Sequence, residues 1–226
     1  MKIINDNQLR DRYYEERGIQ KYFTDDMMSS LTLIRFNKSE LICNEGDNLE
    51  NIYFIVDGKA KVFKTEENGK SLLLCLYRDF GLIGGMEYLS KSTCAGSIQA
   101  ITETYCLCMD LSTITRCFDE DIRFVREIGT ILAKSLARNA QNSSFNLLYP
   151  LENRLATYIY VSNEHNLFKE NMTLLAELLG TSYRHLHRIL VKFCDIGLLS
   201  KKGRNYEILD VKRLERMANQ TINVFY

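Results

Sequence analysis

The sequence predicts an α+β fold, in which a β-rich N-terminal half is followed by helices. Between residues 31 and 110, short apolar runs alternate with polar residues at a period of two, and glycine-containing turns separate them. From about residue 119 to about residue 146, apolar residues recur every three or four positions, which is the spacing of a helix. The single proline, Pro150, then marks a break before a smaller helical region.

The β-rich half is predicted to form a small antiparallel barrel or roll. Seven runs have the composition and alternation of strands, at 31–36, 40–43, 51–56, 59–64, 71–77, 97–102 and 104–110. Turn signals separate them at Glu45-Gly46-Asp47, Asp57-Gly58 and Glu67-Asn68-Gly69. Residues 1–30 predict one or two short helices, the second beginning near Thr24, and 111–118 predicts another.

The long helix is predicted to begin at a cap by Asp119 and to pair with a second copy of itself. At about 40 Å it is longer than a small domain needs to cover its own core. The expected dimer contacts are Val125, Ile128, Leu132, Ser135, Leu136 and Asn139. The alternative is that the helix packs on its own β-roll.

After Pro150 the chain predicts a helix at 151–161 and then two short helices joined by a turn at Gly180. Thr173 is expected to cap the first short helix and Ser182 the second. The first helix would bury leucines 174, 175, 178 and 179, and the second Leu186, Ile189, Leu190 and Phe193. Residues 197–209 then predict a β-hairpin, so the region has the pattern of a winged helix-turn-helix.

This C-terminal region carries a local positive charge. Residues 182–206 hold six lysines or arginines and one acid, whereas the whole chain has a net charge of zero. The expected DNA-binding residues are Thr173, Ser182, Tyr183, Arg184, His187, Arg188, Lys201, Lys202 and Arg204. The alternative is an ordinary helical hairpin with a solvated basic face. Zero net charge argues against a protein that coats nucleic acid along its whole surface.

The composition is that of a globular protein, with 226 residues, 46% of them hydrophobic and 26% charged. We expect three parts: an effector-sensing β-roll with N-terminal helices at 1–118, a dimerisation helix at 119–147 and a DNA-binding domain at 148–226. No run of eighteen apolar residues is present, and the N-terminus lacks the apolar region of a signal peptide, so a cytoplasmic protein without a membrane partner is expected. Seven cysteines and no export signal favour free thiols over disulfides.

The order of these parts resembles the Crp/Fnr family of bacterial transcription regulators. The resemblance rests on Glu45-Gly46-Asp47, on 52–62, on Gly81-Leu82-Ile83-Gly84, on Arg154-Leu155-Ala156 and on 173–209. Within the family, 178–186 and 195–199 are most similar to the YeiL-type regulators. The resemblance implies a jelly-roll-like cyclic-nucleotide-binding-domain fold and a non-enzymatic homodimer that binds an inverted-repeat operator through a recognition helix at 182–194. It also implies RNA polymerase as a partner and an unidentified small-molecule effector in the β-roll. The loop at 162–169 lies where the family often contacts RNA polymerase, but the interpretation as a plain connector is favoured.

The resemblance places the effector site at Gly84, Gly85, Met86, Glu87, Cys94, Ala95, Gly96, Ser97 and Asn139. Gly85 and Cys94 stand where the cyclic-nucleotide binders of the family have a glutamate for the ribose and an arginine for the phosphate. Losing that arginine removes a charge-assisted hydrogen bond worth ~1.5–3 kcal/mol, so cyclic AMP is not expected as effector. Asn139 has a second interpretation, because a polar residue in a heptad core specifies register.

The cysteines leave two interpretations open. The N-terminal cysteine group of the oxygen-sensing branch is absent, but Cys106 and Cys108 share one face of a strand and Cys94 could approach them. These thiols could hold an iron–sulfur cluster or form a redox switch. Alternatively they fill the core as small hydrophobic residues, and no metal site is expected.

In the recognition helix, the resemblance assigns a phosphate contact to Ser182 and a base contact to Arg188, whereas Arg184 replaces the usual glutamate of the family. Tyr183 is equally well explained as a packing residue. The rival function is an enzymatic or small-molecule-binding β-barrel with an accessory helical domain. Because the first 160 residues contain no histidine and no Gly-x-Ser-x-Gly motif, an enzyme is not expected.

Overall fold

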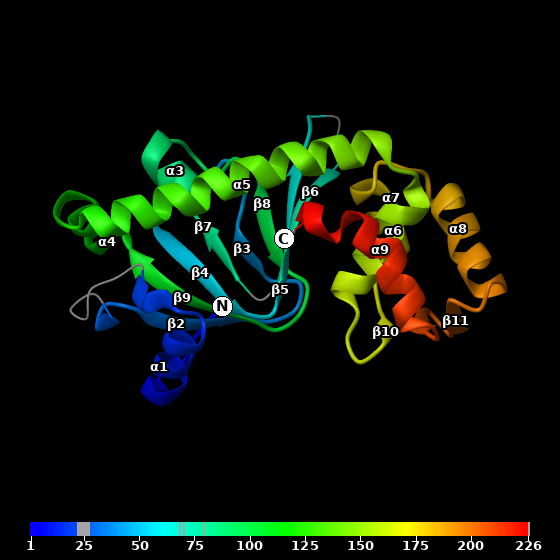
Figure 1. Ribbon diagram of the computed structural model, residues 1–226, viewed down its shortest axis with the longest axis horizontal. Helices are drawn as coiled ribbons and strands as arrows, with labels where there is room; N and C mark the ends of the chain where they lie inside the picture. The colour runs from blue at the N-terminus through cyan, green and yellow to red at the C-terminus, as the bar shows by residue number, and fades with distance from the viewer. Residues whose placement is uncertain (22–27, 68, 70, 79, 226) are drawn as a thin grey trace. The chain divides into compact units, whose positions relative to one another are not determined.

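The computed structural model describes residues 1–21, 28–67, 69, 71–78 and 80–225 (Figure 1). The chain divides into two compact units. The first comprises Met1–Val62 and Tyr77–Ala137, and the second comprises Phe63–Leu76 and Arg138–Tyr226. No helix among the described residues has both the length and the apolar character needed to cross a membrane.

Two antiparallel sheets form the β-roll, as the alternating runs predict. One has the order β1-β2-β9-β4-β7, with bounds Lys2–Ile3, Thr32–Phe36, Thr104–Asp110, Asn51–Asp57 and Gly81–Ile83. The other has the order β3-β8-β5-β6, with bounds Leu41–Cys43, Ser97–Ala100, Lys59–Thr65 and Ser71–Arg78. All seven predicted strands are present, and β1 and β7 are additional strands too short to show a period.

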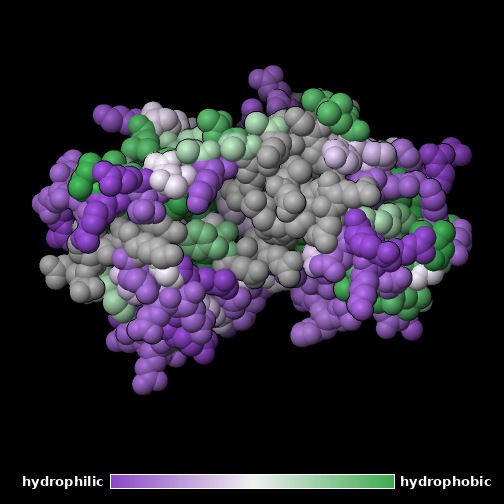
Figure 2. Space-filling view, in the orientation of Figure 1, coloured by the Kyte–Doolittle hydropathy of each residue, from purple (hydrophilic) through white to green (hydrophobic). Residues whose placement is uncertain are grey.

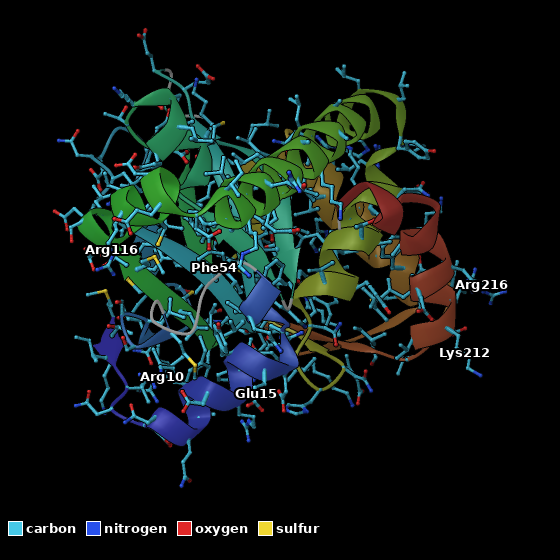
Figure 3. All side chains as sticks on the ribbon, turned by 60° about the vertical axis from the view of Figure 1, so that its left-hand side comes forward. Arg10, Glu15, Phe54, Arg116, Lys212 and Arg216 are labelled. Carbon is cyan, nitrogen blue, oxygen red and sulfur yellow. The ribbon has the colours of Figure 1, made fainter. Side chains whose placement is uncertain are left out.

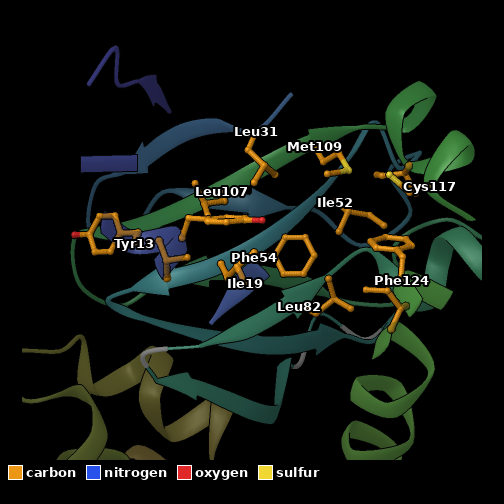
Figure 4. Packing of buried hydrophobic residues seen from close by; sticks show 14 of the residues in the cluster. Tyr13, Ile19, Leu31, Ile52, Phe54, Leu82, Leu107, Met109, Cys117 and Phe124 are labelled. Atoms are coloured by element: carbon orange, nitrogen blue, oxygen red, sulfur yellow. The ribbon is translucent and has the colours of Figure 1, made fainter. Parts of the chain in front are cut away.

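Strand β4, which lies between β9 and β7, buries both of its faces. Ile52, Phe54 and Val56 point into one hydrophobic cluster, while Tyr53 and Ile55 point into a second cluster between the sheets. Figure 4 shows residues of the first cluster, with Phe54 near Leu82 of β7 and Phe124 of a helix. Because side chains alternate along a strand, one strand supplies both cores and holds the roll together.

The described part of the first unit also contains four short helical segments in addition to the start of the long helix. They are α1 (Asn7–Glu16), the 3₁₀ turn η1 (Ile19–Lys21), α3 (Gly85–Ser90) and α4 (Leu111–Glu120). The side chain of Asp6 caps α1 and that of Asp110 caps α4, since each accepts a hydrogen bond from a backbone N–H of the first turn. The second N-terminal helix expected from Thr24 lies outside the described residues.

The long helix α5 runs from Ile122 to Leu148. Its cap is Asp121, whose carboxylate accepts hydrogen bonds from the N–H groups of Arg123 (2.8 Å) and Phe124 (3.4 Å). The expected cap, Asp119, lies instead within the preceding helix α4. Short polar residues spaced two apart are equivalent N-cap candidates in a sequence, and the end of α4 decides between them.

The second unit contains the predicted winged helix-turn-helix. Its helices are α6 (Leu151–Ser162), α7 (Met172–Leu178), α8 (Tyr183–Asp195) and α9 (Val211–Phe225), and its sheet has the order β10-β12-β11, at Leu167–Phe168, Asn205–Ile208 and Leu199–Lys202. Helix α9, which the sequence analysis does not predict, packs against α6. Within the segment expected to be a surface loop, 162–169, Phe168 is fully buried and its ring lies 6.3 Å from that of Tyr158.

Candidate nucleic-acid interface and effector pocket

The recognition helix α8 forms as its sequence predicts. The Ser182 hydroxyl accepts a hydrogen bond from the N–H of His185 at 3.2 Å, which makes Ser182 the N-cap. Gly180 has a φ of +62°, a left-handed conformation that lets the chain turn between the two helices. The predicted apolar face is buried, with Leu186, Ile189, Leu190 and Phe193 each at most 4% exposed. The opposite face is therefore held toward solvent.

Helix α7, which precedes this turn, departs from the prediction at its cap. The side chain of Asn171 accepts hydrogen bonds from the N–H groups of Thr173 (3.0 Å) and Leu174 (3.3 Å), so Asn171 is the cap and Thr173 lies in the first turn. Leu174 is 54% exposed and does not join the buried leucines. Thr173 is exposed.

The outward face of α8 combines two arginines with an aromatic pair. Arg184 and Arg188 are exposed and lie one turn apart. The rings of Tyr183 and His187 stack with centroids 6.0 Å apart, and Tyr183 is 51% exposed, so it is not a core residue. A shallow hollow of about 650 Å³ on this face is lined by Ser182, Arg184, His185, His187, Arg188 and Val191. Two of the lining residues, His185 and Val191, were not among the contacts predicted from the sequence.

The wing carries its cations at an exposed tip. Lys201 pairs with Tyr206 across the hairpin and Lys202 pairs with Asn205, and Gly203 has a φ of +63° in the turn. Lys202 forms an ion pair with Glu207 at 3.3 Å. On α8, Lys192 likewise pairs with Glu152 at 2.8 Å.

The remaining four cations of 182–206 are Arg184, Arg188, Lys201 and Arg204. They are all exposed, and within the described part of the chain none has an acidic partner. These are the charges available to an external anion.

A partly buried arginine supports the turn before α8. Arg154, on α6, donates a hydrogen bond from Nη1 to the carbonyl oxygen of Leu179 at 2.9 Å. That carbonyl lies at the C-terminal end of α7, where carbonyl groups lack partners within the helix. Burial lowers the pKa of Arg154. The contact gives a structural role to one of the motifs that carried the family resemblance.

The predicted effector segment of the β-roll lies on α3 and on the loop before β8. Gly84 has a φ of +91° and precedes α3, while Glu87 Oε1 accepts a long hydrogen bond, 3.5 Å, from the N–H of Ala95. Ser97 Oγ accepts one from the N–H of Glu45 at 3.0 Å. Gly85, Cys94 and Gly96 are buried, Met86 is 50% exposed, and Asn139 is on the part of α5 that belongs to the second unit.

A pocket of about 390 Å³ opens beside this segment. Its lining comprises Ile42, Cys43, Asp47, Asn48, Leu49, Glu50, Asn51, Tyr53 and Cys94. Of the predicted effector residues, Cys94 is the one in this lining. The others come from β3, the following turn and β4, and no pattern in the sequence indicated that these segments converge. The charged side chains in the lining are the two acids Asp47 and Glu50.

The cysteines of β9 lie in the core. Cys106 and Cys108 share a face of the strand, as predicted, and that face points into the cluster between the two sheets, where they are 0% and 6% exposed. Burial raises the pKa of both thiols, that of Cys108 to about 12. No group of three or more potential metal ligands occurs among the described residues.

The predicted dimer face of α5 is partly used within the chain. Ile128 is fully buried in the first cluster together with Phe124, so it is not available to a partner, and Ile131 and Leu132 pack against the same cluster. Ile122 and Leu136 are 71% and 73% exposed. Figure 2 shows green, hydrophobic residues at several places along α5.

The two halves of the chain match two family models. Residues 33–121 match the cyclic nucleotide-binding domain, and residues 153–217 match the Crp-like helix-turn-helix domain. The regulatory protein YeiL of Escherichia coli O157:H7 is 31% identical over 203 residues, which cover 90% of this chain and 93% of that protein. The CRP-like cAMP-activated global transcriptional regulator of Mycobacterium tuberculosis is 21% identical over 215 residues, 89% of this chain and 95% of that protein.

Solved structures share the fold. A Crp/Fnr-family transcriptional regulator from Eubacterium rectale superposes with a TM-score of 0.74 at 16% identity, over 92% of this chain and 99% of that one. A CRP-family regulator from Thermus thermophilus gives a TM-score of 0.66 at 18% identity, over 82% and 96%. With both domain models matched in order and a relative above 30% identity along nearly its whole length, the chain belongs to the Crp/Fnr family of transcription regulators, which are not enzymes.

Proposed function

We propose that this regulator acts as a homodimer that binds an inverted-repeat operator through α8 and responds to an occupant of the β-roll pocket. The observation that carries the DNA-binding assignment is the outward face of α8. There, Arg184 and Arg188 are exposed and unpaired by acids within the described chain, on a helix whose opposite face is buried. A helix of this kind fits the major groove of a duplex.

In this proposal, Arg188 and its neighbours on α8 recognise the base sequence of the operator. An arginine forms two parallel hydrogen bonds with the edge of a guanine, and such a pair discriminates against the wrong base by ~1–3 kcal/mol. Ser182, at the start of the helix, suits a phosphate contact. Lys201 and Arg204 in the wing supply phosphate contacts that carry no sequence information and weaken as salt rises.

Dimerisation follows from the heptad positions of α5. Ile122, Gly129 and Leu136 are spaced by seven, and an added Cβ at Gly129 would meet no atom within 4 Å. Val125 and Leu132 occupy the positions between them, as does Asn139 one heptad further on. Two copies packed along this line would place two recognition helices on successive major grooves, about 34 Å apart.

The effector is proposed to be something other than a cyclic nucleotide. A cyclic phosphate is an anion, and the charged side chains in the pocket lining are Asp47 and Glu50. Those acids would repel it, whereas a neutral or cationic molecule would meet the amide and hydroxyl groups of Asn51 and Tyr53 without that cost. RNA polymerase is proposed as a further partner, through the exposed His165 and Asn166 of the 162–169 segment.

The test begins with binding sites selected from random DNA, followed by footprinting. Wild-type protein should protect two symmetric half-sites. Arg188→Ala should reduce discrimination at one base of each half-site by roughly 5- to 150-fold, while binding to non-specific DNA persists. The matched control is Arg216→Ala, which removes one cation from α9, where the side chain points outward (Figure 3). Unchanged discrimination in Arg188→Ala, or a single unsymmetric footprint, would reject the proposal.

A further inference from the structure

Two cysteine side chains meet at the wall of the β-roll pocket. Cys43 ends strand β3, and Cys94 lies in the loop before β8. Backbone hydrogen bonds hold the loop against the turn that follows β3: Gly46 donates to the carbonyl of Cys94, and Cys94 donates to the carbonyl of Asp47, both at 2.9 Å. Both cysteines line the same pocket. These two hydrogen bonds tie the backbone of Cys94 to the turn that follows Cys43.

The Cys43 side chain is hydrogen-bonded to the loop that carries Cys94. The Cys43 thiol donates a hydrogen bond to the carbonyl oxygen of Gly96 at 3.7 Å, two residues from Cys94. The pKa of Cys43 is raised above its usual value, first by burial and then by a hydrogen bond and charge interaction with Cys94; Glu87 and Asp47 add to the effect. Cys94 is 4% exposed, and Cys43 is partly accessible. A small molecule in the pocket would therefore reach Cys43 first.

We propose that Cys43 and Cys94 form a dithiol modification site that a low-molecular-weight disulfide converts to an intramolecular disulfide. The Cys43 thiol first loses its proton to the solvent, a step that its raised pKa disfavours and that alkaline solution promotes. The thiolate then attacks one sulfur of the small disulfide, releases one thiolate and forms a mixed disulfide. The Cys94 thiolate then attacks Cys43 Sγ and releases the second thiolate. In the balance, two protein thiols lose two electrons and two protons, and one small disulfide becomes two thiols.

The other cysteines are not arranged for this reaction. Cys106 and Cys108 share one face of a single strand and are enclosed in the cluster between the sheets. Cys75 and Cys117 are buried, and Cys194 lies in the DNA-binding domain. A disulfide needs two sulfur atoms about 2.05 Å apart on chain segments that approach each other. Within the described residues, β3 and the loop before β8 are the place where two such segments meet at an open pocket.

Closing this bond would change the pocket. It would join the end of β3 covalently to the loop that carries Ala95, Gly96 and Ser97, which belongs to the predicted effector segment. It would also remove both thiol hydrogens from the pocket wall. The reaction depends on the β-roll alone, so its test does not require that the DNA-binding proposal be correct.

The test uses full-length protein, oxidised glutathione at mildly alkaline pH, and mass spectrometry after alkylation of the remaining thiols. The wild type should lose two hydrogen atoms, and proteolysis should give one linked peptide pair containing Cys43 and Cys94, which dithiothreitol separates. Cys94→Ser should stop at a glutathione adduct on Cys43. The control Cys117→Ser, which alters a buried cysteine elsewhere in the roll, should still form the link.

Each contrary result overturns the proposal. If the wild-type protein keeps a stable glutathione adduct on Cys43 and Cys94 can still be alkylated, then the two sulfur atoms are too far apart to form a disulfide. If the native protein does not react with oxidised glutathione, although the urea-unfolded chain is fully oxidised under the same conditions, then Cys43 and Cys94 are not accessible in the folded protein. A linked peptide pair that includes Cys106 or Cys108 would place the reactive pair elsewhere. Because the decisive readout is made on the wild type, it does not depend on the variants folding.

Discussion

Replacing Leu136 by alanine should weaken the dimer by about two to three orders of magnitude. Leu136 is 73% exposed on α5 and stands two heptads after Ile122, which is 71% exposed. Leucine has three more carbon atoms than alanine, and burying them in an interface contributes ~2.4 kcal/mol, at ~0.8 kcal/mol per carbon, when the side chain is fully exposed in the monomer. Multiplying by the exposed fraction of Leu136 and by the two protomers gives a loss of ~3.5 kcal/mol in the free energy of dimerisation. The dissociation constant should therefore rise roughly 300-fold.

Sedimentation equilibrium over a range of protein concentrations measures this constant directly. Leu209→Ala is the matched control, because Leu209 is a leucine of similar exposure, 56%, that follows β12 and lies off α5. It should leave the dissociation constant unchanged. If Leu136→Ala dimerises as the wild type does, or if the wild type remains a monomer at all concentrations, the heptad line on α5 is not the contact surface.

Two further predictions concern the β-roll. The Asp110 carboxylate accepts hydrogen bonds from the N–H of Thr113 (3.0 Å) and the Thr113 hydroxyl (2.8 Å), and with Ser112 these hold its pKa at about 2. Asp110→Ala should therefore cost ~1 kcal/mol of unfolding free energy at neutral pH. Urea titrations should show this difference shrinking as the pH falls from about 5 to about 2, because stability from a lowered pKa is lost as the carboxylate is protonated. A difference as large at pH 2 as at neutral pH would contradict the assignment. Gly58→Ala should lower the free energy of unfolding by ~1–3 kcal/mol, because Gly58 has a φ of +95° and an added Cβ would lie 2.7 Å from Thr104 Cα. The control is Gly69→Ala. Gly69 also has a positive φ, but an added Cβ there would meet no atom within 4 Å, so the difference between the two variants measures the steric overlap with Thr104.

The recognition helix could be predicted because its signals are local. Ser182, the buried stripe that begins at Leu186, and the turn at Gly180 lie within one short segment, and each is set by helix geometry and capping. The strands were likewise evident from their period of two. The first helix of the motif shows where local signals stop, because Asn171 and Thr173 are both acceptable caps and only the packed structure selects Asn171.

The pocket and the dimer face depend on tertiary packing, and the sequence therefore predicted them less completely. In the sequence, Cys43 has the pattern of an ordinary strand residue. Only the pairing of β3 with β8, and the hydrogen bonds to the loop that carries Cys94, show that the two cysteines lie on neighbouring segments. Ile128 fits an apolar helical stripe equally well whether the stripe faces a partner or the β-roll. Its burial beside Phe124 shows that one side of α5 is already occupied, and that the exposed heptad positions begin at Ile122.

Gly85 lies between the predicted effector segment and α5, the helix of the proposed dimer interface. It is buried at the start of α3, and an added Cβ there would lie 2.8 Å from Leu82 Cδ2 and 3.6 Å from Leu132 Cδ2 of α5. Leu132 is also one of the heptad positions between Ile122 and Leu136. The start of helix α3 thus lies so close to a residue of the proposed interface that a methyl group added at Gly85 would touch it. Because packed interiors transmit small displacements, an effector that moved 84–87 would shift Leu132 and, in the proposed dimer, alter the packing of the two α5 helices.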